Sequence, residues 1–355
     1  MPVALPPPSS LSAIAARVEA RLRTLIDAEY ARWVAFDPDL AGPMAEVGRL
    51  VLAGGKRLRP AFTYWGYVGA GGDPADDVVI DAGGAFELMH AFALFHDDVM
   101  DDAASRRGAP TTHTVFSAHH VEGAWAGEAR RFGEGVAILV GDLAFVYADQ
   151  LLLGAPREAW QVWNELRIEL NIGQVLDILG GVQNDRRRLK AERICRYKSG
   201  KYTIERPLHL GVALAAPQRS SELQPQLSAY GLPLGDAFQM RDDVMGAFGD
   251  EHVTGKPVGG DLREGKPTPL LARAVECATP AQREVLDRVG RINLSDADVT
   301  DIQQVIIETG ALDWLESTIA RLTDEAIAAI ASASIAAEAR DELVALAHYV
   351  SWRHV

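Results

Sequence analysis

The sequence contains few cysteines and carries little positive charge. Among its 355 residues only Cys195 and Cys277 are cysteines. Two thiols without metal-ligand spacing argue against a zinc site or a disulfide framework and are typical of a reduced cytoplasmic protein. Asp and Glu number 49 against 35 Lys and Arg, for a net charge of −14. Because nucleic acids are bound by basic surfaces, this balance argues against a nucleic-acid partner.

No segment predicts a signal peptide or a membrane span. Residues 1–8 are apolar and proline-rich but lack a basic stretch followed by an apolar core. The most apolar long window, residues 136–155, contains Asp142 and Asp149 and therefore predicts a buried helix. We expect a cytoplasmic protein without stable membrane insertion.

Polar and apolar residues do not alternate with the period of a strand, so no strands are expected. Apolar residues recur instead at helical spacing, as at Leu11, Ile14, Val18 and Leu22. The sequence predicts an all-α protein, with residues 1–9 disordered and residues 10–355 in a single domain. Helices are expected at residues 10–36, 45–52, 77–101, 135–153, 158–180, 189–214 (kinked at Pro207) and 220–248, with one from about 59, four or five after 270, and a mobile excursion at 119–135.

Carboxylates are concentrated at the end of one expected helix, at Asp97, Asp98, Asp101 and Asp102. Residues four apart share a helix face, so Asp97 should align with Asp101 and Asp98 with Asp102. Such like charges repel one another unless cations lie among them. Oxygen-only ligands suit Mg²⁺, which takes one or two carboxylates together with water and phosphate oxygens.

A second acidic pair, Asp242 and Asp243, ends another expected helix. Cationic side chains lie near glycines in the same part of the chain, where Lys and Arg can bind phosphate groups. Each acidic or basic stretch alone also fits a solvated surface. The prediction of a binding site therefore depends on their occurring together. The cations concerned are Lys56, Arg57 and Arg59 after Gly54-Gly55, then Arg106 and Arg107, Lys198 beside Ser199-Gly200, and Lys256 and Lys266.

Two acidic helix ends could hold Mg²⁺ between them while the cations hold diphosphates. Phosphoryl transfer from a nucleotide is disfavoured, because no Gly-x-x-x-x-Gly-Lys-Ser/Thr motif occurs. The pattern predicts a substrate with a diphosphate head and an apolar tail, which a helical bundle lined with Leu, Phe and Ala can accommodate.

This series of motifs resembles that of the trans-type polyprenyl (isoprenyl diphosphate) synthases. The resemblance implies an isoprenoid synthase fold, roughly a dozen helices around a central cavity, usually as a homodimer. It also implies Mg²⁺-dependent elongation of an allylic diphosphate by isopentenyl diphosphate, with three Mg²⁺ ions when substrate is bound. The matching segments occur in family order at residues 54–60, 87–90, 96–101, 106–108, 173–174, 198–199, 239–243 and 254–266, and residues 268–355 would form C-terminal helices.

Carried over position by position, the resemblance assigns a role to each motif residue. Asp97, Asp101 and Asp242 would ligate Mg²⁺, supported by Asp98, Asp102 and Asp243. Isopentenyl diphosphate would be held by Lys56, Arg59, His90 and Arg107. The allylic diphosphate would be held by Arg106, Lys198, Ser199, Lys256 and Lys266, with Gln239 orienting the surroundings. The residues expected to be catalytic are Asp97, Asp98, Asp101, Lys198, Gln239 and Asp242.

The second acidic motif departs from the family, because Gly246 stands where its last aspartate usually lies. The residues before the first motif are expected to set product length. Met89 and Ala93 precede Asp97 by two turns and one turn, and the family uses the position of Phe92 as a floor that blocks long chains. A bulky Phe92 beside a small Ala93 favours a short product, with geranylgeranyl diphosphate preferred over farnesyl or longer polyprenyl diphosphates.

Three other functions are less favoured. A class I terpene cyclase would need a second motif that residues 184–192 only imitate, since Arg188 replaces its hydroxyl residue. An inactive regulatory subunit would have no need of the full set of acids and cations. A di-iron bundle would need Glu-x-x-His pairs that the expected helices lack.

Overall fold

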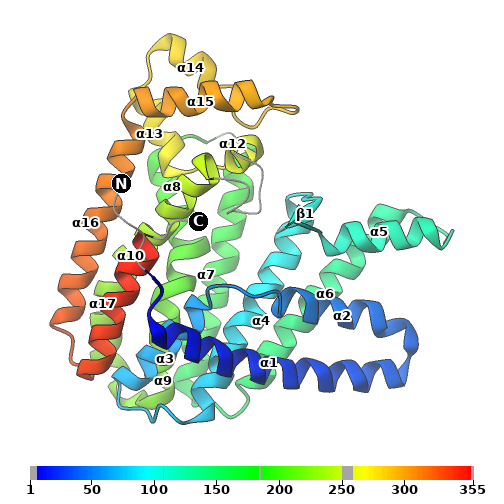
Figure 1. Ribbon diagram of the computed structural model, residues 1–355, viewed down its shortest axis with the longest axis vertical. Coiled ribbons are helices and arrows are strands. Elements are labelled where there is room, and N and C mark those ends of the chain that lie inside the picture. Colours follow the sequence, from blue (N-terminus) through cyan, green and yellow to red (C-terminus); the bar gives the residue numbers. More distant parts are fainter. Residues whose placement is uncertain (1–5, 107, 184, 250–258, 353–355) are drawn as a thin grey trace. The chain divides into compact units, whose positions relative to one another are not determined.

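The computed structural model describes residues 6–106, 108–183, 185–249 and 259–352, and these are overwhelmingly helical (Figure 1). The predicted all-α class is confirmed. One turn departs from it, because β1 (Ser105–Arg106) and β2 (Ala109–Pro110) form a two-residue antiparallel hairpin. Strands this short cannot show the alternation of polar and apolar residues by which a strand is predicted.

The chain divides into two compact units, each described by itself. The N-terminal unit comprises residues 9–64 and 72–156, and the C-terminal unit comprises residues 65–71 and 157–352 with the first residues of the chain. A single domain at 10–355 stays a prediction. Ser9 already belongs to the first helix, so the described part of the expected disordered start is confined to residues 6–8.

The N-terminal unit is built around α4 (Asp77–Met100). Gly83 and Gly84 allow α1 and α6 to approach this helix, since an added Cβ would lie 3.0 Å from Val18 or Leu151. Of the described helices, α4 is long and apolar enough to cross a membrane, but 67% of its apolar window is buried, as in a core helix. The other helices are α1 (Ser9–Phe36), α2 (Ala41–Val51), the start of α3 (Leu58–Gly69), α5 (Thr112–Glu122) and α6 (Ala129–Leu151).

The expected excursion at residues 119–135 is largely helical, so that expectation is wrong. The last turn of α5 and the first turns of α6 occupy most of it, and only residues 123–128 connect them. The Glu128 side chain caps α6 by accepting hydrogen bonds from the backbone N–H groups of Arg130 and Arg131. The Gly, Glu and Arg residues of segment 119–135 therefore belong to the boundary between two helices and to the charged first turns of α6.

In the C-terminal unit, α10 packs against α16 and α17 (Figure 1). The core includes Met240 on α10, Leu270 on α13, Ile302 on α15, and Leu315 and Ile319 on α16. Burial of these apolar side chains supplies the main favourable term in folding. The helices are α7 (Arg157–Val182), α8 (Arg188–Ile194), α9 (Arg206–Ala215), α10 (Ser220–Phe248), α12 (Gly260–Glu264), α13 (Pro269–Cys277), α14 (Pro280–Leu286), α15 (Asp296–Glu308), α16 (Ala311–Ala331) and α17 (Ala337–Ser351).

The expected helix at residues 189–214 is interrupted by a π-helix, Cys195–Glu205, rather than kinked at Pro207. Pro207 lies near the start of α9, where its missing N–H is tolerated. The wide turns are held from two sides by close approaches. An added Cβ on Gly173 of α7 would lie 2.4 Å from the Lys198 nitrogen, and one on Gly235 of α10 would lie 2.7 Å from the Gly200 oxygen.

A buried ionic network joins α7 to the π-helix and α9. Glu169 accepts hydrogen bonds from Arg206 at 2.6 and 2.7 Å and also pairs with Lys201. Burial alone would raise the pKa of Glu169, but the hydrogen bonds from Arg206 and Lys201 lower it below its ordinary value. The carboxylate therefore stays ionised and holds the π-helix in register with α7.

We expect Gly235→Ala to lower the free energy of unfolding by about 2–3 kcal/mol, because the new methyl group meets backbone atoms of Gly200 that cannot rotate away. The midpoint of urea denaturation measures this loss. Gly181→Ala is the matched control, since nothing lies within 4 Å of its added Cβ. The control should gain up to about 1 kcal/mol from reduced backbone entropy. Equal midpoints for both variants would contradict the close approach of the π-helix and α10.

Candidate active site

The first acidic stretch lies at the C-terminal end of α4. Asp101 caps the helix, and its N–H donates to the Asp97 carbonyl at 2.8 Å. These two residues are one turn apart, as expected. Asp102 has left-handed backbone (φ 52°), and its carboxylate lies 3.6 Å from the Arg130 guanidinium. Because the helix has already ended, the expected alignment of Asp102 with Asp98 does not hold.

Asp98 is buried at 4% exposure and is paired with Arg106 of the hairpin. The Arg106 Nε donates to Asp98 Oδ1 at 2.7 Å, and its Nη2 donates to Asp97 Oδ2 at 3.3 Å. Burial raises the pKa of Asp98, and the charge of Arg106 opposes that rise. The hairpin thus places the Arg106 guanidinium beside the carboxylates of Asp97 and Asp98. Arg107 lies outside the described residues.

His96 fixes the end of α4 against α6. Its Nε2 donates to the Ile138 carbonyl at 3.1 Å, and an added Cβ on Gly141 would lie 2.5 Å from its ring. Phe92 packs one turn earlier against Phe145 of α6, with 4.7 Å between ring centroids, and against His96 at 4.6 Å. Met89 is fully buried, whereas His90 and Ala93 are half-buried. The positions expected to set product length therefore lie on a helix held firmly by α6.

The glycine pair before α3 forms a loop anchored by Arg57. Gly54, Gly55 and Arg57 all have positive φ, at 82°, 142° and 48°. The buried Arg57 pairs with buried Glu87 of α4 and donates to the Val51 carbonyl at 2.9 Å. Sequence reasoning gave Arg57 no role of its own. The signal was an acid, Glu87, in an otherwise apolar helix, which requires a buried partner.

Lys56 and Arg59 flank this anchored residue, and the two differ in exposure. Lys56 is exposed, while Arg59 is half-buried in the first turn of α3. The contacts of Arg57 with Glu87 and with the Val51 carbonyl hold the backbone between Lys56 and Arg59. This arrangement suits the binding of an anion by two side chains.

The second acidic pair lies near the end of α10 in the C-terminal unit. Asp242 is half-buried and Asp243 is buried, and the Gln239 amide donates to Asp243 Oδ1 at 3.0 Å. Burial raises the pKa of Asp243 well above its ordinary range, and the Asp261 and Asp242 carboxylates add to that rise. Its Oδ2 has no hydrogen-bond partner within the described ranges.

Asp261 of α12 occupies the space beside Gly246, where the family motif usually ends in aspartate. An added Cβ on Gly246 would lie 1.9 Å from Asp261 Oδ2, so no larger residue fits there without displacing that carboxylate. Sequence reasoning missed Asp261. The missing aspartate was the available signal, but it did not select Asp261, since Asp250 and Glu251 come earlier in the following loop. A carboxylate from another helix therefore stands near the vacant motif position.

Lys198 of the π-helix pairs with Asp177 of α7, with 2.5 Å between Nζ and Oδ2. Asp177 is a second residue that the sequence did not single out, although it lies one turn after Gln174 on the same helix. Ser199 is half-buried beside Lys198. Lys266 lies 2.5 Å from Glu264 and 3.8 Å from Asp261. Lys256 lies outside the described residues.

Comparison with known proteins decides the family. The sequence profile of the polyprenyl synthetase family matches residues 44–308. The chain belongs to this family. It is similar to a geranylfarnesyl diphosphate synthase of Aeropyrum pernix, with 36% identity over 277 residues covering 76% of this chain and 80% of the relative. It is also 30% identical over 306 residues to a (2E,6E)-farnesyl diphosphate synthase of Mycobacterium tuberculosis, covering 83% of this chain and 79% of the relative.

The fold matches a solved structure of the same family. A geranylgeranyl pyrophosphate synthase of Corynebacterium glutamicum, crystallised with isoprenyl diphosphate and magnesium, superimposes with a TM-score of 0.90. The two proteins share 36% sequence identity, and the match covers 97% of this chain and 99% of that one. The predicted enzyme class is confirmed, and the polyprenyl synthase is a prenyltransferase of the short-chain isoprenyl diphosphate synthase type.

The donor set of the synthase fits Mg²⁺ that is shared with a substrate. Within the described residues no three His, Cys, Asp or Glu side chains gather closely enough to hold a metal by themselves. In the N-terminal unit, Asp97 and Asp101 at the end of α4 offer carboxylate oxygens only. Since Mg²⁺ is usually bound by one or two carboxylates with waters and substrate phosphates, this set suits an ion whose coordination a diphosphate completes.

We expect Glu87→Ala to lower the free energy of unfolding by about 3–5 kcal/mol, because it leaves the buried Arg57 guanidinium without its partner. Urea denaturation measures the loss. Glu19→Ala, which removes a carboxylate paired with Arg23 on the exposed face of α1, is the control and should change stability by less than about 1 kcal/mol. Similar losses in the two variants would mean that the Arg57–Glu87 pair does not anchor the loop.

Proposed function

We propose that the synthase elongates an allylic diphosphate with isopentenyl diphosphate and that geranylgeranyl diphosphate is its preferred product. The observation that carries this proposal is the pair Asp97 and Asp101 at the C-terminal end of α4. The helix dipole and the neighbouring carboxylates both disfavour negative charge there. Arg106 is bonded to Asp97 and Asp98, and Arg130 lies 3.6 Å from Asp102, so two cations face four carboxylates. Further positive charge is therefore favoured at this helix end.

In the proposed site, Asp97, Asp101 and Asp242 would hold Mg²⁺, with three ions bound when substrate is present. Mg²⁺ supplies charge that stabilises the departing diphosphate. The buried Asp98 and Asp243 support the ligands, and the carboxylate of Asp261 takes the place of the aspartate missing at Gly246. Asp102, which pairs with Arg130, contributes more weakly.

Two sets of cations bind the two diphosphates in this proposal. Lys198 exchanges its partner Asp177 for a phosphate oxygen, which places a point charge on the leaving group. Gln239 keeps Asp243 oriented through its hydrogen bond. The allylic diphosphate is held by Arg106, Lys198, Ser199, Lys256 and Lys266, and isopentenyl diphosphate by Lys56, Arg59, His90 and Arg107.

The chemistry follows from these charges. The C–O bond of the allylic diphosphate breaks as cationic side chains stabilise the leaving diphosphate. The alkene of isopentenyl diphosphate attacks the allylic cation, and binding both substrates together can supply about 7–11 kcal/mol of the barrier. The proton is then lost to the released diphosphate. Apolar surroundings keep water away from the cation.

Incubation with isopentenyl diphosphate, Mg²⁺ and each allylic starter should give diphosphate release and a longer prenyl chain. A chelator should abolish turnover. Asp101→Ala should lower kcat about 10³-fold, since a metal ligand contributes several kcal/mol to the transition state. Asp39→Ala, at an exposed carboxylate of the same unit, should stay within twofold. Absence of turnover with every starter would favour a regulatory subunit instead.

The packing of Phe92 supports the proposed product length. Its ring is held between His96 and Phe145 and therefore cannot swing aside to admit a longer chain. The relatives described above are named as synthases of farnesyl, geranylgeranyl and geranylfarnesyl diphosphate. The proposed product lies within this range of chain lengths. Farnesyl or a longer polyprenyl diphosphate is the alternative.

We expect Phe92→Ala to lengthen the product by at least one five-carbon unit, because removing the ring opens space beside Ala93 and Met89. Chromatography of dephosphorylated products measures the chain length. Phe36→Ala, at a residue 77% exposed, is the control and should leave the product unchanged. An unchanged product in Phe92→Ala would show that this ring is core packing alone.

We also propose that the synthase is a homodimer. One face of α7 exposes Ile168, Ile172, Val175, Leu179 and Val182, each between 44% and 83%. Their spacing of three and four residues forms a continuous apolar stripe. On α6, Leu139 and Val146 are likewise exposed, as is Leu153 just after the helix. Apolar faces this large usually bind a protein, and a second copy of the chain fits the family.

Replacing Ile172 and Val175 by Glu should convert the dimer to a monomer, because four charges would be buried across a symmetric contact. Light scattering after size-exclusion chromatography measures the mass. Ile292→Glu, at a lone residue 92% exposed, should remain dimeric. A wild-type monomer at micromolar concentration would overturn the proposal.

The cellular setting follows from the same properties. The net charge of −14 does not favour nucleic acid, and the apolar α4 is a core helix. We propose a cytoplasmic enzyme without stable membrane insertion. Its partners are isopentenyl diphosphate and an allylic diphosphate.

A further inference from the structure

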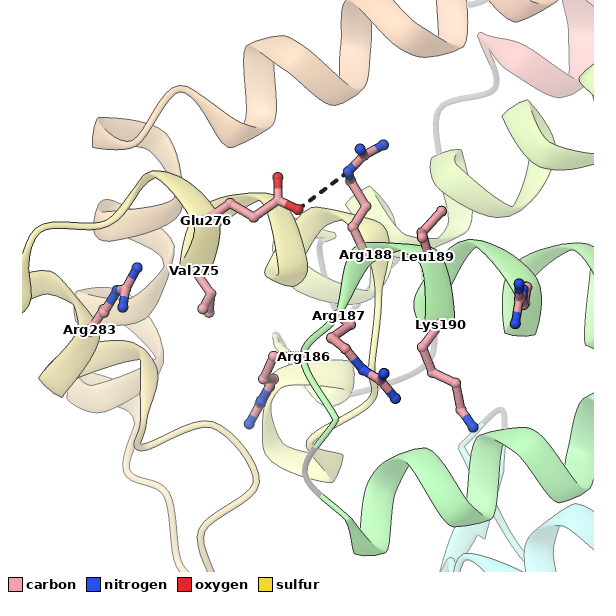
Figure 2. A pocket seen from close by; sticks show the side chains of 9 residues that line it. Arg186, Arg187, Arg188, Leu189, Lys190, Val275, Glu276 and Arg283 are labelled. Atoms are coloured by element: carbon pink, nitrogen blue, oxygen red, sulfur yellow. Dashed lines mark hydrogen bonds and ion pairs between the residues drawn. The ribbon is translucent and has the colours of Figure 1, made fainter.

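The C-terminal unit contains a basic pocket of about 700 Å³ between the start of α8 and the helices α13 and α14. Figure 2 shows Arg186 and Arg187 just before α8 and Arg188 to Lys190 in its first turn, while Val275, Glu276 and Arg283 lie across from them. None of its lining residues belongs to the proposed substrate sites. The cationic lining residues are Arg186, Arg187, Arg188, Lys190, Arg193 and Arg283.

Only two of these six cations are paired with carboxylates. Arg187 bonds Asp185 at 2.6 Å. Arg188 bonds Glu192 at 2.8 Å and Glu276, the one acidic lining residue, at 3.4 Å (Figure 2). In the part of the chain that the structure describes, the other four have no carboxylate within ion-pair distance. A chain of net charge −14 thus places, among its described residues, four cations without an ion pair around one pocket.

Arg186 also has an unsatisfied buried donor. Its Nη2 donates to the Val289 carbonyl at 3.2 Å, but its Nη1 is buried and has no acceptor in the described ranges. Burial lowers the pKa of Arg186, so the surroundings disfavour its charge as they stand. Buried donors are normally satisfied, which makes an incoming acceptor favourable here.

Apolar groups complete the wall. Leu189 is 67% exposed, and the half-buried Val275 lines the same space from α13. The volume lies within the range of small-molecule sites and exceeds the needs of a single phosphate. Several arginines suit phosphate oxygens, which they can grip with paired N–H groups.

We propose that this pocket, outside the proposed substrate sites, binds a molecule that carries a diphosphate group and an organic body. Arg186 binds the diphosphate through its unsatisfied Nη1, the other cations of the lining attract it, and Leu189 or Val275 contacts the body. A nucleoside diphosphate and a prenyl diphosphate share this chemistry. The proposal does not depend on the proposed function, because it concerns binding in the absence of turnover.

The test is calorimetric titration of the full-length protein in EDTA, where Mg²⁺-dependent binding and turnover are absent. The probes are inorganic diphosphate, ADP and geranyl diphosphate. We expect at least one organic diphosphate to bind, with affinity that falls as salt is raised. Tighter binding of ADP or of geranyl diphosphate identifies the body, and equal binding of inorganic diphosphate would overturn the role of Leu189 and Val275.

Variants place the binding in this pocket. The double variant Arg193→Glu/Arg283→Glu changes two exposed side chains, so it should fold, which circular dichroism verifies. It should weaken binding at least tenfold. The double variant Arg157→Glu/Arg321→Glu makes the same change in net charge at exposed sites elsewhere in the C-terminal unit and should stay within twofold.

A further variant separates this pocket from the proposed allylic site. Lys198→Ala should leave binding in EDTA unchanged, because Lys198 does not line the pocket. Loss of binding in Lys198→Ala but not in Arg193→Glu/Arg283→Glu would overturn the proposal, as would absence of binding by all three probes. Neither result would bear on whether the protein elongates prenyl chains.

Discussion

The mutual repulsion of carboxylates at the end of α4 is the constraint on which the site depends. Negative charge is unfavourable at a helix C-terminus, and it is more so with four aspartates in six residues. The fold neutralises these negative charges only in part. Arg106 returns from the hairpin to Asp98 and Asp97, while Asp102 turns away toward Arg130. Asp97 is half-buried and Asp101 is exposed. In the proposed site, the charge that these two carboxylates keep is what binds Mg²⁺ and, through it, diphosphate.

Such a charged end must be held by rigid neighbours, and close helix contacts provide them. Gly141 lets α6 approach His96, directly before the acidic stretch. In the C-terminal unit, Gly173 and Gly235 hold the π-helix from α7 and α10. The π-helix carries Lys198, whose partner Asp177 keeps it ordered before any ligand arrives. π-Helical turns are uncommon and often mark functional positions, and here one carries a lysine of the proposed diphosphate site.

Departures from the family pattern are balanced elsewhere in the chain. Gly246 lacks the usual carboxylate, and Asp261 lies against it from α12. The acidic surroundings raise the pKa of Asp243 beyond what burial alone does, and the Gln239 amide opposes that rise. A carboxylate from another helix can lie where the motif lacks one, so a missing motif residue does not by itself imply a missing function. The same reasoning underlies the proposal for the basic pocket beside α8, where cations outnumber the acidic residues of the lining.

The sequence by itself determined the helical class, the helix ends that carry the acids, and the family, because helical periodicity and motif order are local properties of the chain. It could not show that residues 119–135 are mostly helical, that a π-helix replaces a kink at Pro207, or that Asp102 leaves the face of Asp98. Arg57 with Glu87, Lys198 with Asp177, and Asp261 beside Gly246 are pairs separated by between 15 and 30 residues. Only the tertiary structure brought them together, because burial and close packing decide which charges meet.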